Sequence, residues 1–140
     1  MLWRKDDEMN QEKEPSIQVD SIAHEVIGAA LEVHKALGPG FLESVYEHAL
    51  CVELKFRGIP FTTQKPLPIL YKGEPVGEGK LDLMVRDSLI VELKTVDSLL
   101  PIHTAQLISY LKATGLQLGL LINLNVPVLK DGIKRIILSQ

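Results

Sequence analysis

The sequence predicts an α/β domain in which helices pack on a mixed β-sheet. Three observations support this prediction. Residues 20–58 contain two segments with helical periodicity, residues 59–96 are punctuated by Pro and Gly and carry short β-rich runs, and residues 101–139 combine another helical segment with two apolar runs. The expected order is ααβββαββ, without internal repeats, which is typical of helices packed on a mixed sheet.

Two helices are expected first, joined by a short Gly-Pro-Gly segment. The first has Asp20 or Ser21 as its N-cap and ends at Gly38, and the second ends at Gly58. The apolar stripe of the first helix would consist of Ile22, Val26, Ala29, Val33 and Leu37. That of the second would consist of Leu42, Val45, Ala49, Leu50 and Leu54.

The rest of the chain is expected to form the sheet and a third helix. This helix begins at Pro101 and ends at Gly115, since proline is favoured in the first turn and glycine after the last. The run "LQLGLLINL" that follows is apolar nearly throughout, which predicts a buried strand. The expected strands span residues 62–71, 76–86, 89–96, 116–124 and 133–139.

The length and charge of the chain bound its organisation. With 140 residues it is long enough for one domain, which we expect to span residues 17–140. Residues 1–16 hold five acidic and three basic residues and are expected to form a disordered acidic tail. The net charge of −3 comes largely from this tail, so the remaining chain is near neutral and its charge does not predict nucleic-acid binding.

Other classes of protein are also disfavoured. No apolar run reaches membrane-spanning length, and the N-terminus is acidic where a signal peptide would be basic and then apolar, so we expect a cytoplasmic protein. Cys51 has no partner for an intramolecular disulfide and is expected to be a small core residue. Four histidines lack a second nitrogen or sulfur ligand at metal spacing and are expected to be non-catalytic: His24, His34, His48 and His103.

The segment "IVELK", residues 90–94, places two charged side chains in a run that otherwise looks like a buried strand. Because side chains of a strand alternate between faces, Glu92 and Lys94 share one face. Charged residues are rarely buried without partners, so this face is either solvated or part of a polar site. Asp82, in the preceding strand, is a candidate partner. The opposite face of its strand is expected to carry Leu81, Leu83 and Val85.

The register of the hairpin decides whether the two carboxylates meet. A two-residue turn at residues 87–88 would put Asp82 and Glu92 on opposite faces, whereas a three-residue loop at residues 86–88 would pair them directly. Paired carboxylates about 5 Å apart would repel each other and attract a cation. Oxygen ligands of this kind suit Mg²⁺ or Mn²⁺, with waters and a substrate phosphate completing the shell, and Lys94 could then stabilise charge that develops on the phosphate.

These residues resemble those of a known group. "LDLMV" followed ten positions later by "ELK" resembles the PD-(D/E)XK nuclease superfamily, in which a carboxylate on one strand and an E-x-K on the next bind the metal. The resemblance implies a restriction-endonuclease-like fold. Within this superfamily, Gly40, Glu43 and Tyr46 in "GFLESVY" match the motif of the GxxExxY proteins. The similarity runs from about Ser16 to the C-terminus.

The resemblance also implies roles for individual residues. Asp82 and Glu92 would be metal ligands, joined by the backbone carbonyl of Leu93, and Lys94 would be the catalytic lysine. Glu43 would be an acidic residue that approaches the metal or a ligand water. Gln106 and Tyr110 would face the site from the third helix, where their i, i+4 spacing puts them on one face. The candidate substrate-binding residues are Tyr46 and Lys80, the latter at a position where the family often has Arg.

The resulting hypothesis is an Mg²⁺- or Mn²⁺-dependent nuclease that acts on DNA or RNA. A homodimer could form if the run at residues 116–124 or the final strand is an edge of the sheet. The alternative is a noncatalytic module of the same fold that binds nucleic acid or protein, which the acidic balance and the lack of a basic stripe favour. Simpler interpretations exist for single residues. Glu43 suits the first turn of any helix, and Lys134 with Arg135 could be a solvated strand edge or a weak nucleic-acid contact.

Overall fold

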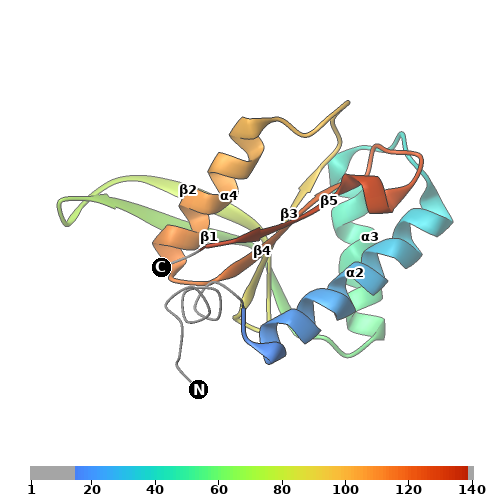
Figure 1. Cartoon of the computed structure of the whole chain (residues 1–140), viewed down its shortest axis with the longest axis horizontal. Coiled ribbons are helices and arrows are strands. Elements are labelled where there is room, and N and C mark those ends of the chain that lie inside the picture. Colours follow the sequence, from blue (N-terminus) through green and yellow to red (C-terminus); the bar gives the residue numbers. More distant parts are fainter. Residues whose placement is uncertain (1–14, 139–140) are drawn as a thin grey trace, which may run out of the picture.

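A computed structural model of the chain describes residues 15–138 and contains a five-stranded mixed sheet with helices on both faces (Figure 1). The predicted order ααβββαββ is confirmed, with a short 3-10 helix added before the last strand. The elements are α2 (Ile17–Leu37), α3 (Glu43–Phe56), β1 (Phe61–Tyr71), β2 (Glu74–Val85), β3 (Leu89–Lys94), α4 (Pro101–Thr114), β4 (Leu118–Asn123), η1 (Leu129–Gly132) and β5 (Ile133–Ile137).

The strands follow the chain order β1-β2-β3-β4-β5 across the sheet. Neighbouring strands are antiparallel except β3 and β4, which are parallel because α4 crosses over between them. β4 is therefore an interior strand, and β1 and β5 are the edges. Of the two segments that the sequence offered as dimer edges, only β5 is one.

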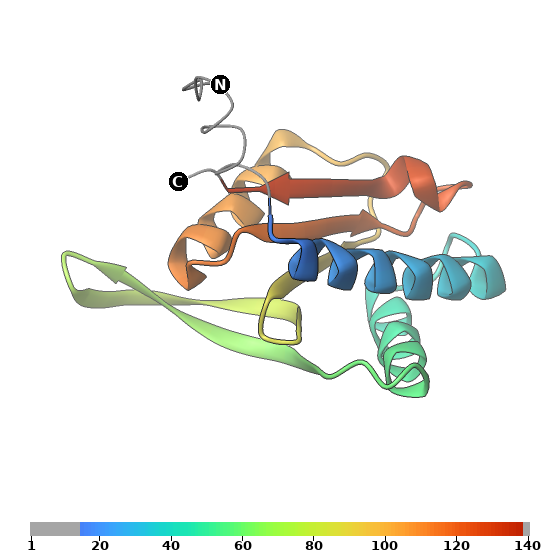
Figure 2. The same ribbon diagram turned by 60° about the horizontal axis from the view of Figure 1, so that its bottom comes forward.

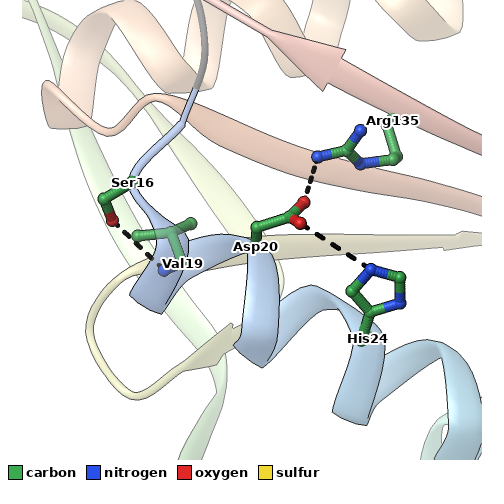
Figure 3. Close-up of polar contacts among 5 residues, drawn as sticks. All are labelled: Ser16, Val19, Asp20, His24 and Arg135. Carbon is green, nitrogen blue, oxygen red and sulfur yellow. Dashed lines mark hydrogen bonds and ion pairs between the residues drawn. The ribbon is translucent and has the colours of Figure 1, made fainter.

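The first helix begins one turn earlier than predicted. Ser16 is its N-cap, since its side-chain oxygen accepts a hydrogen bond from the Val19 amide at 3.2 Å. Asp20, one of the two predicted caps, lies inside α2 and pairs with Arg135 of β5 and with His24 (Figure 3). Ser16 is also the last residue of the predicted tail, of which residues 1–14 lie outside the described part of the chain.

The buried face of α3 differs from the predicted stripe. Tyr46, Leu50 and Leu54 face the core, whereas Leu42 is 74% exposed and Val45 is 37% exposed. Leu42 is the extended N-cap residue and lies outside the helix, and the buried stripe follows the four-residue spacing of Tyr46, Leu50 and Leu54.

Two hydrophobic clusters cover the two faces of the sheet. One lies between the sheet and α2 with α3, and the other lies between the sheet and α4. β4 is buried at every position, as its apolar run predicts. Within residues 15–138, no helix is long and apolar enough to cross a membrane.

The side chains of β2 stop alternating regularly at Asp82. Leu83 packs in the α2 and α3 cluster, but Leu81 packs in the α4 cluster, so the prediction that they share a face is wrong. On the neighbouring strand, Gln64 adopts a φ of 50°, and the ladder between β1 and β2 skips this position. The Gln64 side chain donates a hydrogen bond to Glu47 of α3 at 2.6 Å. Both strands therefore change direction where Asp82 lies.

Beyond this break, β1 and β2 continue as a two-stranded ribbon, residues 65–81, which we call the arm. It projects past the end of α4 at one end of the molecule (Figure 2). Leu67 and Ile69 hold its base against α4, and most of its other positions are exposed. Pro66 and Pro68 lie on β1, an edge strand, where a missing N–H leaves no donor for another strand.

A close approach at Gly132 gives a test of the fold. A Cβ there would lie 2.2 Å from the backbone oxygen of Asn123. We expect Gly132→Ala to lower the free energy of unfolding by roughly 1–3 kcal/mol, because the two segments must separate. Urea unfolding would measure this. Gly77→Ala is the matched control, since a Cβ at Gly77 meets no atom within 4 Å; equal losses in both variants would contradict the packing described.

Candidate active site

The hairpin between β2 and β3 has the loop that the paired carboxylates require. Its ladder begins with Val85 opposite Leu89, which leaves residues 86–88 as a three-residue loop. The register that the sequence analysis made a condition for the site is therefore confirmed. Continued one residue beyond the last pair of the ladder, Leu83 with Val91, this register sets Asp82 opposite Glu92.

Beyond Leu83 and Val91, side-chain hydrogen bonds replace the backbone ladder between β2 and β3. A carboxylate oxygen of Glu92 accepts a hydrogen bond from the Asp82 amide at 3.1 Å, and a carboxylate oxygen of Asp82 accepts one from the Leu93 amide at 2.9 Å. Each carboxylate thus binds the opposite strand. Because the N–H and C=O of one strand residue point to the same side, the Leu93 carbonyl is directed toward β2 as well.

Glu92 is an unusually buried acid. Glu92 is only 4% exposed, and its neighbours along the strand, Val91 and Leu93, are apolar. Burial, followed by the negative charge of Asp82, raises the pKa of Glu92 to about 8. The backbone hydrogen bond from Asp82 and the charge of Lys94 oppose this shift without cancelling it. The surroundings of Glu92 therefore disfavour its charged form.

Glu43 and Lys94 belong to the same electrostatic group. Desolvation and then the Asp82 carboxylate raise the pKa of Glu43, and the Lys94 ammonium lowers it. Glu43 is the first residue of α3, so the helix brings a third carboxyl toward the two strands. Four of the predicted site residues therefore come together around the point where β2 and β3 part: Glu43, Asp82, Glu92 and Lys94.

The segment after Lys94 is fixed by a residue that the sequence analysis missed. Asn123 of β4 is 1% exposed and lies opposite Lys94 in the parallel ladder. Its amide nitrogen donates to the Val96 carbonyl at 2.8 Å, and its oxygen accepts from the amides of Val96 and Asn125 at 3.1 and 3.2 Å. A polar residue at the end of a fully buried strand was the signal that could have identified it.

Gln106 and Tyr110, the two site residues predicted on α4, contact each other and pack beside β2. The Gln106 side chain donates a hydrogen bond to the Tyr110 hydroxyl at 3.3 Å. The ring of Tyr110 packs on β2 at Gly79, where a Cβ would lie 2.9 Å from the ring. Within residues 15–138, neither side chain hydrogen-bonds to Asp82. Lys80 is exposed on the arm, two residues before Asp82.

Tyr46 has a structural role in place of the predicted substrate contact. It is fully buried, and its hydroxyl donates to the Gly38 carbonyl at 2.5 Å and accepts from the Phe41 amide at 3.2 Å. These bonds close the joint between α2 and α3, in which Gly40 has a φ of 109° that suits only glycine. The joint in turn fixes the start of α3 and thus Glu43.

Two of the four histidines make structural hydrogen bonds. His34 is buried and bonds the Val126 carbonyl at 2.7 Å, and the ring of His103 accepts from the Leu100 amide at the start of α4. Cys51 is a free thiol partly packed against the core, and burial raises its pKa, which disfavours a nucleophile.

Comparison with known proteins identifies the group to which this geometry belongs. A model of the PD-(D/E)XK nuclease superfamily matches residues 20–136. The chain belongs to this superfamily. Its five-stranded mixed sheet with three flanking helices is consistent with the predicted restriction-endonuclease-like fold. No curated protein matches the sequence. The crystal structure of SSO0001 is 22% identical with a TM-score of 0.49; the match covers 89% of this chain but only 60% of that one.

PD-(D/E)XK nucleases generally use divalent metal ions such as Mg²⁺. The oxygen atoms at this site can be compared with the ligands that such an ion needs. Within residues 15–138, no three His, Cys, Asp or Glu side chains form a ready cluster for a metal. Asp82 and Glu92 alone supply two carboxylates, with the Leu93 carbonyl directed to the same side. One or two carboxylates, waters and a substrate phosphate are the usual shell of Mg²⁺, so these residues fit the ion.

The pKa of Glu92 gives a sign for the effect of pH on stability. The pKa of Glu92 is higher in the folded protein than in the unfolded protein, so the folded protein binds more protons between these two values. The free energy of unfolding therefore falls as pH rises from about 4.5 to about 8. We expect Glu92→Gln, which keeps the acceptor for Asp82, to flatten this slope and to be more stable than wild type at pH 8 in EDTA.

Urea unfolding at pH 5 and pH 8 would measure the difference, with the exposed Glu78→Gln as the matched control. The same slope in wild type and Glu92→Gln would contradict the assignment of a buried, proton-binding Glu92.

The joint between α2 and α3 can be tested without changing its packing. We expect Tyr46→Phe to lower the free energy of unfolding by about 1–3 kcal/mol, because the Gly38 carbonyl and the Phe41 amide lose their partner. Thermal or urea unfolding measures this loss. Tyr71→Phe removes the hydroxyl of a tyrosine that is 63% exposed and should change stability little; equal effects would argue against the joint.

Proposed function

We propose that this PD-(D/E)XK protein is a divalent-metal-dependent nuclease that hydrolyses phosphodiester bonds. One observation supports it above the others. Asp82 and Glu92 each bind the opposite strand across the break in the ladder, so two carboxylates and Lys94 converge where β2 and β3 part. Packing alone does not call for two acids here, because a buried charge costs free energy unless it is compensated.

In the proposed site, Asp82, Glu92 and the Leu93 carbonyl would hold Mg²⁺ or Mn²⁺. Such an ion supplies Lewis-acid stabilisation of the phosphate and lowers the pKa of a nearby water. The chain supplies the remaining functions. The Lys94 ammonium would stabilise the negative charge that develops on the phosphate oxygens, and Glu43 would orient the attacking water. Water adds to phosphorus as the bond to the leaving oxygen breaks, which leaves one phosphate end and one hydroxyl end.

The outer residues support the same proposal. Lys80 is exposed two positions from Asp82 and could bind a flanking phosphate as a point charge. Gln106 and Tyr110 form one hydrogen-bonded pair that packs on Gly79, so α4 would border the substrate path. We also assign the chain to the GxxExxY group, because Gly40, Glu43 and Tyr46 all match its motif.

The metal is tested first, by titration calorimetry with Mn²⁺ at neutral pH. We expect wild type to bind Mn²⁺ and Asp82→Ala/Glu92→Ala to lose binding while remaining folded by circular dichroism, because the two carboxylates are the charged ligands. Glu32→Ala/Glu78→Ala, which removes two exposed carboxylates elsewhere, is the matched control and should bind as wild type does. Binding that survives in Asp82→Ala/Glu92→Ala would place the metal elsewhere.

Turnover is tested with single- and double-stranded DNA and RNA in the presence of Mn²⁺ or Mg²⁺. We expect cleavage by wild type, and a fall of roughly 100–1,000-fold in rate for Lys94→Met, since one electrostatic contact to the transition state is lost. Lys35→Met, an exposed lysine of α2, should leave the rate unchanged. Cleavage that persists in Glu92→Gln would indicate a contaminant, and metal binding without cleavage of any substrate would favour the noncatalytic module.

A further inference from the structure

Gln64 of β1 has a backbone conformation that its strand does not require. Its φ of 50° lies in the left-handed region, which residues other than glycine rarely adopt. Among residues 15–138, the other such residues besides glycine are Lys72, Arg86 and Asp87, which lie in the two hairpin turns, where a positive φ is common. Gln64 lies inside a strand and is exposed, so neither a turn nor burial of its side chain accounts for the conformation. It must therefore be held by a contact of Gln64 with its surroundings.

Gln64 lies opposite Asp82 in the register of β1 and β2. The ladder pairs on either side are Thr63 with Leu83 and Lys65 with Leu81, and the pair between them is the one that the ladder skips. The Asp82 amide donates to Glu92, so Asp82 has Glu92 on one side of its strand and Gln64 on the other. β2 turns over at this level, since Leu81 and Leu83 pack on opposite faces of the sheet. The left-handed residue therefore lies beside the point at which β2 sets the direction of the Asp82 side chain.

The side chain of Gln64 joins β1 to α3. Its amide nitrogen donates a hydrogen bond to the Glu47 carboxylate at 2.6 Å. Glu47 follows Glu43 by one turn of α3, so the two side chains share a face of this helix. Desolvation first, and the charges of Asp82 and Glu47 among the smaller causes, raise the pKa of Glu43, which agrees with this arrangement. The hydrogen bond therefore connects the strand opposite Asp82 with the helix face that presents Glu43.

The conformation of Gln64 and its hydrogen bond contribute little to the stability of the fold by themselves. A left-handed residue other than glycine costs free energy, and a hydrogen bond at an exposed position competes with water. An extended residue at position 64 would avoid this cost and continue the ladder. What the two features share is their place between acidic side chains of different elements, Asp82 on β2 and Glu43 on α3. Backbone strain of this kind is typical of a functional site.

We propose that Gln64 and Glu47 are positioning residues for the candidate active site. The hydrogen bond between them holds the left-handed conformation in β1, and this conformation sets the Asp82 carboxylate against β3 and at a fixed place relative to Glu43. Neither Gln64 nor Glu47 contacts the ion or the substrate in this role. The consequence for metal binding and turnover rests on the proposed nuclease function. The position of Asp82 can be measured without metal or substrate, through its hydrogen bond with the Leu93 amide.

The test exchanges the donor and the acceptor of this hydrogen bond. Gln64→Glu sets two carboxylates against each other and removes the bond. Gln64→Glu/Glu47→Gln restores it in the reverse direction, because the amide introduced at position 47 donates to the carboxylate introduced at position 64. The net charge of this double variant equals that of the wild type. Gln117→Glu, which makes the same change at an exposed glutamine outside the site, is the matched control.

Amide hydrogen exchange, followed by NMR on the full chain without metal, reports the position of Asp82. The amides of Asp82 and Leu93 donate the two hydrogen bonds to the carboxylates, and Leu120 of the buried strand β4 reports global unfolding. We expect Gln64→Glu to speed exchange at Asp82 and Leu93 by roughly tenfold and to leave exchange at Leu120 unchanged. The double variant and Gln117→Glu should exchange as wild type does. A pair that only stabilised the fold would affect all three amides alike.

Titration calorimetry with Mn²⁺ and cleavage assays extend the comparison to the proposed function. We expect Gln64→Glu to weaken Mn²⁺ binding and to lower kcat, each by roughly tenfold or more, because the ligand Asp82 is misplaced. The KM for nucleic acid should stay unchanged, and the double variant should recover both properties. The charge that Gln64→Glu adds would by itself attract a cation, so weaker Mn²⁺ binding reports a change in position.

Three results would overturn the proposal. The first is exchange at Asp82 and Leu93 that is equal in Gln64→Glu and wild type. The second is an equal increase at all three amides, which would show a role in stability alone. The third is a double variant that exchanges as fast as Gln64→Glu does. A wild type that binds no Mn²⁺ would instead overturn the proposed nuclease function, and the exchange measurement would still decide whether Gln64 and Glu47 position Asp82.

Discussion

The exchange of hydrogen bonds between Asp82 and Glu92 organises the centre of this protein. Two strands part at this position, and the side chains take over the amides that the ladder gives up. Without that substitution, buried N–H groups would be left unpaired, at a cost of about 1–3 kcal/mol each. The same pair of side chains therefore keeps the sheet intact and places two acidic groups beside each other. Structure and proposed chemistry draw on the same atoms.

The remaining elements support this centre from three directions. Asn123 holds the chain just after Lys94 from the neighbouring strand, and the joint closed by Tyr46 positions the first residue of α3. On the other face, Tyr110 packs against the backbone at Gly79. Each support acts through buried hydrogen bonds or close packing, which hold a site more rigidly than exposed ion pairs can.

Much of this could be predicted from local pattern. Element order follows from the change between helical and strand periodicity. The parity of side chains reduces the hairpin to two possible registers, and the structure decides for the one with a three-residue loop. Resemblance to a family then marked Asp82, Glu92 and Lys94. The first cap was misplaced because Ser16 and Asp20 both suit an N-cap, and only tertiary contacts show that Asp20 is taken by Arg135.

What escaped prediction depends on contacts between distant segments. The left-handed Gln64 has no signature in its sequence neighbourhood, and the ladder skips it between the pairs that hold Leu81 and Leu83, which face different clusters. The buried hydroxyl of Tyr46 likewise becomes visible only when the carbonyl of Gly38 lies beside it. Periodicity arguments assume a regular strand or helix, and these residues mark where regularity ends.

The three residues of the motif, Gly40, Glu43 and Tyr46, have different roles. Gly40 permits a backbone turn, Tyr46 secures that turn, and only Glu43 presents a functional group toward the carboxylates. The shape of the joint alone therefore accounts for two of the three residues. A chain without the proposed chemistry would still need both of them to form this joint, so the motif indicates the fold more directly than it indicates activity.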